Sequence, residues 1–183
     1  MKEFIAFKKI PRLSRECVIT EKIDGTNASI YIGEDGEFLT GSKERWITPS
    51  DDNRGFSKWA HENKDELMKL GVGHHFGEWW GSGIQRGYGY KKGEKFFSLF
   101  NVSKWSDDSI RPKCCLVVPV IGIGMFRTEF IEFALQELVK TGSIASPGFM
   151  MPEGVVIFHT QSGYLFKKTI KNDEAPKSII KEE

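Results

Sequence analysis

The segment with the clearest chemical potential is Glu21-Lys22-Ile23-Asp24-Gly25, where a lysine comes just before a tight turn. A lysine at the end of a strand can act as a nucleophile if its amine is neutral part of the time, which desolvation and nearby cations favour. In an extended segment, Glu21 points to the opposite face from Lys22 and would serve a different partner. The alternative is an exposed lysine beside an Asp-Gly hairpin turn, and this short pattern alone does not exclude it.

Two glutamates, Glu78 and Glu153, lie beside apolar strand residues, where the charge of a carboxylate needs a binding partner. Glu78 lies in an aromatic strand, where an unpaired carboxylate would be costly, and ribose hydroxyls would suit it. Its structural alternative is an ion pair with Arg86. Glu153 is followed by Gly154 and an apolar strand, and a carboxylate at the mouth of a strand suits a hard metal ion.

Basic side chains occur in two segments that can hold phosphate. Ser42, Lys43 and Arg45 follow a predicted strand and combine two cations with a hydroxyl. Lys167 and Lys168 lie in the last predicted strand, which can place a lysine next to a phosphate group. In isolation, a charged surface loop explains the first segment equally well.

Hydrophobic periodicity and turn residues predict an α+β fold with mainly antiparallel sheets. Residues 18–40 are typical of an antiparallel meander. The first helical segment follows acidic cap residues, and its helical spacing of apolar residues is interrupted near Asn63. Thr128 caps a second helix that Gly142 ends. Because no glycine-rich phosphate loop is present, side chains on strands would have to hold a nucleotide. The predicted strands cover 18–20, 28–32, 38–40, 74–79, 95–102, 116–121, 154–158 and 164–170, and the predicted helices cover 56–70 and 129–141.

Composition excludes several classes of protein. The net charge of +1 gives no global field for nucleic acid, although local basic clusters occur at 8–15 and 86–95. The three cysteines fit neither a disulfide framework nor a zinc spacing, which favours a reduced, cytoplasmic protein. The longest apolar run, 114–125, is too short and too broken by Gly and Pro to cross a bilayer, so no membrane association is expected.

The order of these segments resembles that of the covalent nucleotidyltransferases (ligases and capping enzymes), and within them the RNA ligases. The resemblance spans about residues 18–171. It implies a nucleotidyltransferase or ATP-grasp-like ligase core, in which antiparallel sheets flanked by helices form a nucleotide-binding cleft. It also implies an adenylation domain over 1–171 and a polar C-terminal tail over 172–183, without a separate OB-like domain.

The resemblance assigns roles to individual residues. Lys22 would attack the α-phosphate of ATP to form lysyl-AMP, Glu153 would bind Mg²⁺ or Mn²⁺, and Lys167 would complete the catalytic set. Lys43 stands where the family carries an arginine, so Arg45 would substitute. Thr169 replaces a second lysine, for which Lys168 or Lys171 would compensate. The expected nucleotide-binding set is Glu21 for the adenine amino group, Glu78 for the ribose and Phe100 for stacking on adenine, with Lys22, Ser42, Lys43, Arg45, Lys167 and Lys168.

The resemblance also implies partners. AMP would pass to the 5′-phosphate of an RNA or nicked-duplex end, and a 3′-OH would then seal the strand, as in RNA repair. A helper protein would replace a C-terminal domain, and the setting would be the cytoplasm, including a host cytoplasm if the protein is viral. The alternatives are a DNA ligase, a GTP-using capping enzyme, and a non-catalytic nucleic-acid-binding module. Joint retention of Lys22, Glu78, Glu153 and Lys167 argues against the last.

Overall fold

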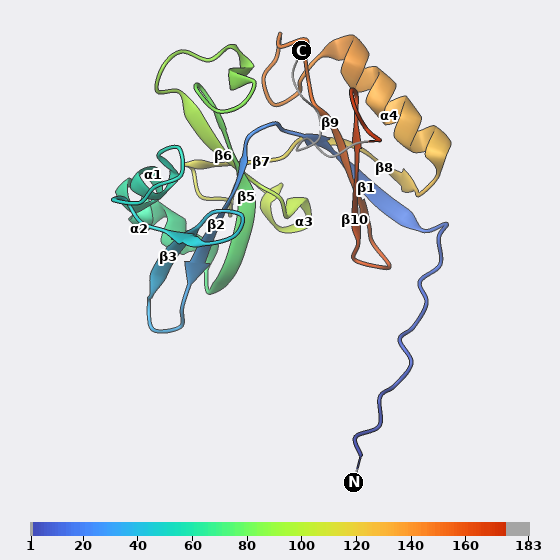
Figure 1. Ribbon diagram of the computed structural model, residues 1–183, viewed down its shortest axis with the longest axis horizontal. Coiled ribbons are helices and arrows are strands. Elements are labelled where there is room, and N and C mark those ends of the chain that lie inside the picture. Colours follow the sequence, from blue (N-terminus) through green and yellow to red (C-terminus); the bar gives the residue numbers. More distant parts are fainter. Residues whose placement is uncertain (1, 175–183) are drawn as a thin grey trace.

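Two sheets form the framework of the computed structural model, which describes residues 2–174 (Figure 1). The strands are β1 (Glu16–Lys22), β2 (Thr26–Ile32), β3 (Phe38–Gly41), β4 (Trp46–Ile47), β5 (Gly73–Gly81), β6 (Lys95–Leu99), β7 (Cys115–Val117), β8 (Val120–Met125), β9 (Gly154–His159) and β10 (Leu165–Thr169). The helices are α1 (Phe56–Glu62), α2 (Lys64–Leu67), α3 (Val102–Trp105) and α4 (Thr128–Thr141), with 3₁₀ turns η1 (Met68–Leu70) and η2 (Gly87–Gly89).

The strand order confirms the predicted α+β class. One sheet has the order β10-β9-β1-β8 and the other the order β4-β3-β2-β5-β6-β7. The strand pairs are antiparallel except for β6 and β7, which are parallel. Helices lie on the outer side of each sheet, α1 and α2 beyond the six-stranded sheet and α4 beyond the four-stranded one (Figure 1).

The predicted meander over residues 18–40 is wrong at its first step. β1 pairs with β8 and β9, whereas β2 pairs with β3 and β5, so the chain changes sheet between Lys22 and Thr26. A Cβ on Gly25 would lie 2.4 Å from the carbonyl oxygen of Trp79, so glycine is needed where the link crosses β5. The residues 23–25 are therefore a link between two sheets, and we call them the inter-sheet link.

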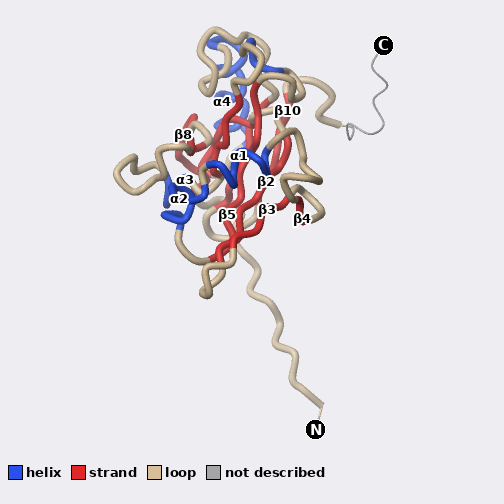
Figure 2. The backbone as a smooth tube through the Cα atoms, turned by 90° about the vertical axis from the view of Figure 1, so that its left-hand side faces the viewer, coloured by secondary structure: helices blue, strands red, loops and turns tan. Residues whose placement is uncertain are grey.

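Each sheet buries one face against its helices. Ile30, Trp79 and Phe97 pack with Phe56 of α1 in the larger core. The smaller core joins α4 to the four-stranded sheet and contains Cys17, Ile19, Ala134, Leu135, Leu138, Val155 and Ile157. Figure 2 shows the strands running together in the middle of the molecule, with the segment before β1 extending away from them.

The ends of the helices agree with the sequence in part. The N-cap of α1 is Gly55, which has no side chain to cap it, and Asp52 accepts the backbone N–H groups of Ser57 and Lys58 from three residues before that position. Asn63 separates α1 from α2 as predicted. Gly142, with a φ of 81°, ends α4 as predicted. Thr128 is instead the first residue of α4, and no side chain caps that end.

Two predicted strands are too long. The strand predicted over 95–102 ends at Leu99, because Asn101 caps α3 by accepting the N–H of Lys104. The strand predicted over 116–121 is two strands in different sheets, β7 and β8, separated at Pro119, whose carbonyl accepts the N–H of Glu21. Proline lacks the N–H that a continuous ladder requires. The helices among residues 2–174 include none with the length and apolar character needed to cross a bilayer.

Candidate active site

The centre of the site is an ion pair between Lys22 and Glu153. Lys22 ends β1 and Glu153 comes directly before β9, and the antiparallel register places Lys22 opposite Gly154. Lys22 Nζ lies 2.5 Å from Glu153 Oε2. The side chain of Glu153 is 2% exposed and that of Lys22 is 23% exposed, so a buried carboxylate holds an amine that solvent still reaches.

Glu78 joins the site from the other sheet. Its Oε1 accepts the backbone N–H of Gly25 at 3.0 Å, and its Oε2 accepts Asn27 Nδ2 at 3.0 Å. Burial raises the pKa of Glu78 to about 7, although the charge of Lys22 and the Gly25 hydrogen bond both oppose this shift. The carboxyl group therefore changes charge close to neutral pH, beside the link that follows Lys22.

Sequence reasoning missed the role of Asp24. Arg86 Nε donates to Asp24 Oδ2 at 2.7 Å, so the ion pair considered between Arg86 and Glu78 is wrong. Arg86 Nη1 also donates to the carbonyl oxygen of Met151 at 3.0 Å, which ties the inter-sheet link to the segment before Glu153. The N–H of Asp24 donates to Tyr88 Oη at 2.7 Å. The sequence predicts Asp24 only as a turn residue and offers Arg86 only as a partner for Glu78, so no spacing indicates the Asp24–Arg86 pair.

Glu21 lies on the face of β1 opposite Lys22, as strand alternation predicts. It is 1% exposed and accepts three hydrogen bonds, from Ser143 Oγ at 2.6 Å, Ile144 N–H at 2.8 Å and Ala145 N–H at 2.9 Å. Its carboxylate thus fixes the segment that follows α4. Recognition of the adenine amino group by Glu21 stays a prediction.

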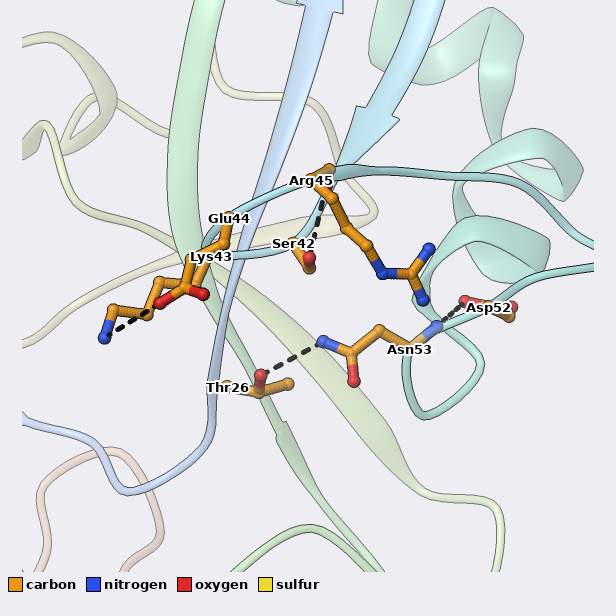
Figure 3. Close-up of a pocket in the computed structure, with 7 residues that line it drawn as sticks. All are labelled: Thr26, Ser42, Lys43, Glu44, Arg45, Asp52 and Asn53. Atoms are coloured by element: carbon orange, nitrogen blue, oxygen red, sulfur yellow. Dashed lines mark hydrogen bonds and ion pairs between the residues drawn. The ribbon is translucent and has the colours of Figure 1, made fainter. Parts of the chain in front are cut away.

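The charged side chains of the basic turn, residues 42–45, do not point toward a common site. Arg45 makes a two-pronged ion pair with Asp51, through Nη1 at 2.5 Å and Nη2 at 3.0 Å. Lys43 Nζ lies 3.7 Å from Glu44 Oε1, and Figure 3 shows the Lys43 side chain pointing away from Arg45. Between this turn and Asn53, whose Nδ2 donates to Thr26 Oγ1, lies a hollow of about 300 Å³ (Figure 3).

The two predicted lysines of β10 lie on opposite faces of its sheet. Lys167 is opposite Val156, which is opposite Thr20, so Lys167 shares a face with Lys22 two residues further along β1. Lys168 instead faces α4, where its Nζ lies 3.1 Å from Glu132 Oε1. The structure therefore brings Lys167 to the Lys22 side and does not bring Lys168 there.

Phe100 shares a sheet face with Glu78. Ser98 is the registered partner of Glu78, and Phe100 is two residues further on, so its side chain is on the same side. The ring is 41% exposed and is therefore accessible for stacking. The Asn101 side chain accepts the N–H of Lys104 and so caps α3. Residues 2–174 contain no cluster of three or more His, Cys, Asp or Glu residues that would hold a metal unaided.

Lys22 lies where the chain passes from one sheet to the other, and it pairs with Glu153, which comes directly before a strand that begins at Gly154. This arrangement agrees with the comparison against protein families. The model of the RNA ligase family matches residues 15–173, most of the chain. The chain belongs to the RNA ligase family. A search of curated proteins finds no match.

Solved RNA ligase structures share the fold. A Naegleria gruberi RNA ligase variant in its apo form has a TM-score of 0.62 and 19% identity, covering 84% of this chain and 49% of its own. A second variant, with ATP and Mn, has a TM-score of 0.63 and 17% identity, covering 93% and 58%. A third, with AMP and Mn, has a TM-score of 0.62 and 18% identity, covering 85% and 49%. The chain thus spans about half the length of the RNA ligases it matches.

Proposed function

We propose that this RNA ligase family chain is an ATP-dependent adenylyltransferase that joins RNA ends, with Lys22 as its nucleophile. The observation that carries the proposal is the 2.5 Å contact between Lys22 Nζ and Glu153 Oε2, formed across 131 positions of sequence. Glu78 stands beside it through its bond to Gly25. The Naegleria RNA ligase structures with ATP and Mn, or with AMP and Mn, support the choice of nucleotide and of a divalent ion.

The first step is attack by Lys22 on ATP. The neutral amine forms a bond to the α-phosphorus, the bond from that phosphorus to the α,β-bridging oxygen breaks, and pyrophosphate leaves with the electron pair. The ammonium of the ion pair must first pass a proton to Glu153 Oε2, which is placed to accept it, and the nitrogen releases a second proton to solvent once its bond to phosphorus has formed. In the second step, an oxygen of a 5′-phosphate attacks the same phosphorus and releases Lys22. In the third, a 3′-OH attacks the 5′-phosphate, and AMP leaves.

The residues present fit a divalent ion that is shared with the nucleotide. Since residues 2–174 offer no cluster of three ligands, Glu153 would hold the ion together with phosphate oxygens, which is how magnesium is commonly bound. When bound, the ion neutralises negative charge on the phosphoryl oxygens.

The remaining nucleotide contacts extend the proposal across both sheets. Glu78 would accept hydrogen bonds from the ribose, Phe100 would stack on adenine, and Lys167 would contact phosphate from the Lys22 face. Arg45 would have to exchange its partner Asp51 for phosphate. Glu21, Ser42 and Lys43 complete the proposed set. Lys168 is the weakest member, because it already pairs with Glu132.

The decisive test is incubation with α-labelled ATP or GTP and Mg²⁺ or Mn²⁺, followed by a denaturing gel. We expect a label from ATP alone that survives denaturation and is lost in Lys22→Ala. Lys140→Ala, which removes an exposed lysine in the last turn of α4, is the matched control and should label normally. A label from GTP would instead support a capping enzyme. No label from either nucleotide would support the non-catalytic module.

The substrate is the second part of the proposal. We propose RNA ends with a 5′-phosphate and a 3′-OH, encountered in the cytoplasm of the producing or host cell. Sealing assays on RNA and on nicked DNA separate this from the DNA ligase alternative. Normal self-adenylation with slow sealing would place the missing contribution in a helper protein or another domain.

A further inference from the structure

An exposed group of aromatic rings lies on the sheet face that carries Glu78. Trp46 is 50% exposed, Phe76 is 57% exposed, and His74 between them is also exposed. The rings of Trp46 and His74 are stacked, with centroids 5.6 Å apart and planes 21° apart, and those of His74 and Phe76 are 5.5 Å and 36° apart. We call these three residues the aromatic platform.

Strand register places the platform beside the proposed adenylation site. Phe76 and Glu78 are two residues apart on β5, so they share a face and lie roughly 7 Å apart along the strand. Trp46 is registered with Gly41, Gly41 with Ser29, and Ser29 with Phe76, which puts the outer rings in one row across the sheet. A ligand that leaves the Glu78 region along this face therefore meets the rings next.

A shallow hollow connects the platform to the basic turn. Its volume is about 270 Å³, and it is lined by Ser29, Gly41 and Trp46 together with residues 42–45. A Cβ on Gly41 would lie 2.5 Å from Ser29 Oγ and 3.4 Å from the Trp46 ring, so the floor of the hollow depends on small residues. The Trp46 ring beside this hollow offers a surface for a base, and Lys43 and Arg45, which now pair with Glu44 and Asp51, would bind its phosphate by exchanging those partners.

The geometry points to a stacking platform for unpaired nucleobases: we propose that Trp46, His74 and Phe76 bind a single-stranded RNA end next to the adenylation site. This inference rests on the proposed function, and it specifies the substrate as unpaired RNA. Bases in a duplex are already stacked within the helix, whereas splayed bases of a single strand can stack on protein rings. The adjoining cations favour a polynucleotide over an apolar protein surface.

Binding of a fluorescein-labelled, non-self-complementary RNA of about 12 nucleotides tests the platform by anisotropy. We expect Trp46→Ala and Phe76→Ala each to weaken binding of the single strand about 10-fold, and Trp46→Phe to retain most of it. The same RNA in a perfect duplex should be much less sensitive to both alanine variants. Phe133→Ala removes a ring that is 60% exposed on α4, beyond the other sheet, and should bind like the unaltered protein.

A spectroscopic signal checks that stacking is direct. Trp46 is 50% exposed, whereas Trp79, Trp80 and Trp105 are at most 3% exposed and Trp59 is half-buried. A base stacked on the platform should therefore quench mainly Trp46, and the quenching should disappear in Trp46→Phe even though that variant still binds. Quenching that persists in Trp46→Phe would overturn the proposal.

Self-adenylation separates this inference from the proposed function. The platform variants should form the lysyl-adenylate at the normal rate, because their rings lie outside the Lys22–Glu153 pair. If the unaltered protein does not self-adenylate but binds single strands through Trp46, the proposed function fails and the platform stands. If it self-adenylates and both alanine variants bind single strands normally, the platform is overturned. Concentration-dependent self-association that Trp46→Ala abolishes, without a loss of RNA binding, would assign the surface to a second copy instead.

Discussion

At the scale of single residues, the site depends on a few buried charges whose partners come from distant parts of the sequence. Glu153 is 2% exposed and meets Lys22, while Glu78 is 8% exposed and meets Gly25 and Asn27. A buried carboxylate requires such partners because desolvation of its charge is costly. The reactivity of Lys22 and the charge of Glu78 are therefore set by their neighbours.

Replacing Glu153 by Gln tests its part in the chemistry. Gln keeps the shape but removes the charge that in the proposed function would receive the Lys22 proton and bind the divalent ion, so self-adenylation should fall by about 10²-fold or more. The rate of labelled lysyl-adenylate formation measures this. Glu132→Gln, which removes the partner of Lys168 on α4, should leave the rate unchanged. Equal rates in both variants would remove Glu153 from the mechanism.

The raised pKa of Glu78 predicts a pH-dependent stability. Between pH 4.5 and about 7, the folded protein holds the Glu78 proton more tightly than the unfolded chain does, so the free energy of unfolding falls as pH rises through this window. Across this window, the free energy of unfolding should fall by a total on the order of 3 kcal/mol. Urea midpoints at several pH values should show a shallower decline in Glu78→Gln. An identical decline in both proteins would contradict the assignment.

At the scale of elements, the inter-sheet link is what brings the site together. It carries the chain from β1 in one sheet to β2 in the other, and Arg86 fastens it by bonding Asp24 and the carbonyl of Met151. Lys22 at one end of the link and Glu78 beside the other end therefore keep a fixed relation. A hairpin at the same place would have left them within a single sheet.

Gly25→Ala should disturb this link. The added Cβ would lie 2.4 Å from the Trp79 carbonyl oxygen and 2.8 Å from Trp80 Cβ, so the backbone must move. We expect a loss of about 1–3 kcal/mol of stability and a marked drop in self-adenylation, measured by urea unfolding and by labelling. Gly36→Ala, at an exposed turn with a φ of 83° and open space around its Cβ, should cost only about 1 kcal/mol and leave labelling intact.

At the scale of the whole molecule, the two sheets share one ligand site in the proposed function. Lys22, Glu153 and Lys167 belong to the four-stranded sheet and its edge, whereas Glu78 and Phe100 belong to the six-stranded sheet and its edge. A nucleotide that contacts both sheets binds only the folded assembly. Its binding free energy therefore adds to the stability of both halves.

Thermal unfolding with ATP and Mn²⁺ measures that linkage. At a ligand concentration of about 100 times Kd, the stabilisation is about 2.7 kcal/mol, which for a chain of this length raises Tm by roughly 5–10 °C. GTP at the same concentration should produce a much smaller shift. A shift of equal size with GTP would argue against adenine-specific recognition.

The sequence by itself determined the α+β class, the helix break at Asn63 and three of the residues that meet in the site: Lys22, Glu78 and Glu153. These follow from local rules, because periodicity, cap residues and a charged residue in an apolar strand are visible within a few positions. The resemblance in motif order added the expectation that these distant segments line one nucleotide-binding cleft, which no local pattern carries.

Only the tertiary structure decided which sheet each strand joins. The change of sheet after β1, the division at Pro119 and the Asp24–Arg86 contact all depend on long-range pairing, which turn residues do not encode. Strand alternation separates Lys167 from Lys168, but only the packing of α4 shows which of the two faces Glu132. The aromatic platform was hidden for the same reason, since His74 and Phe76 meet Trp46 only after four strands align in one sheet.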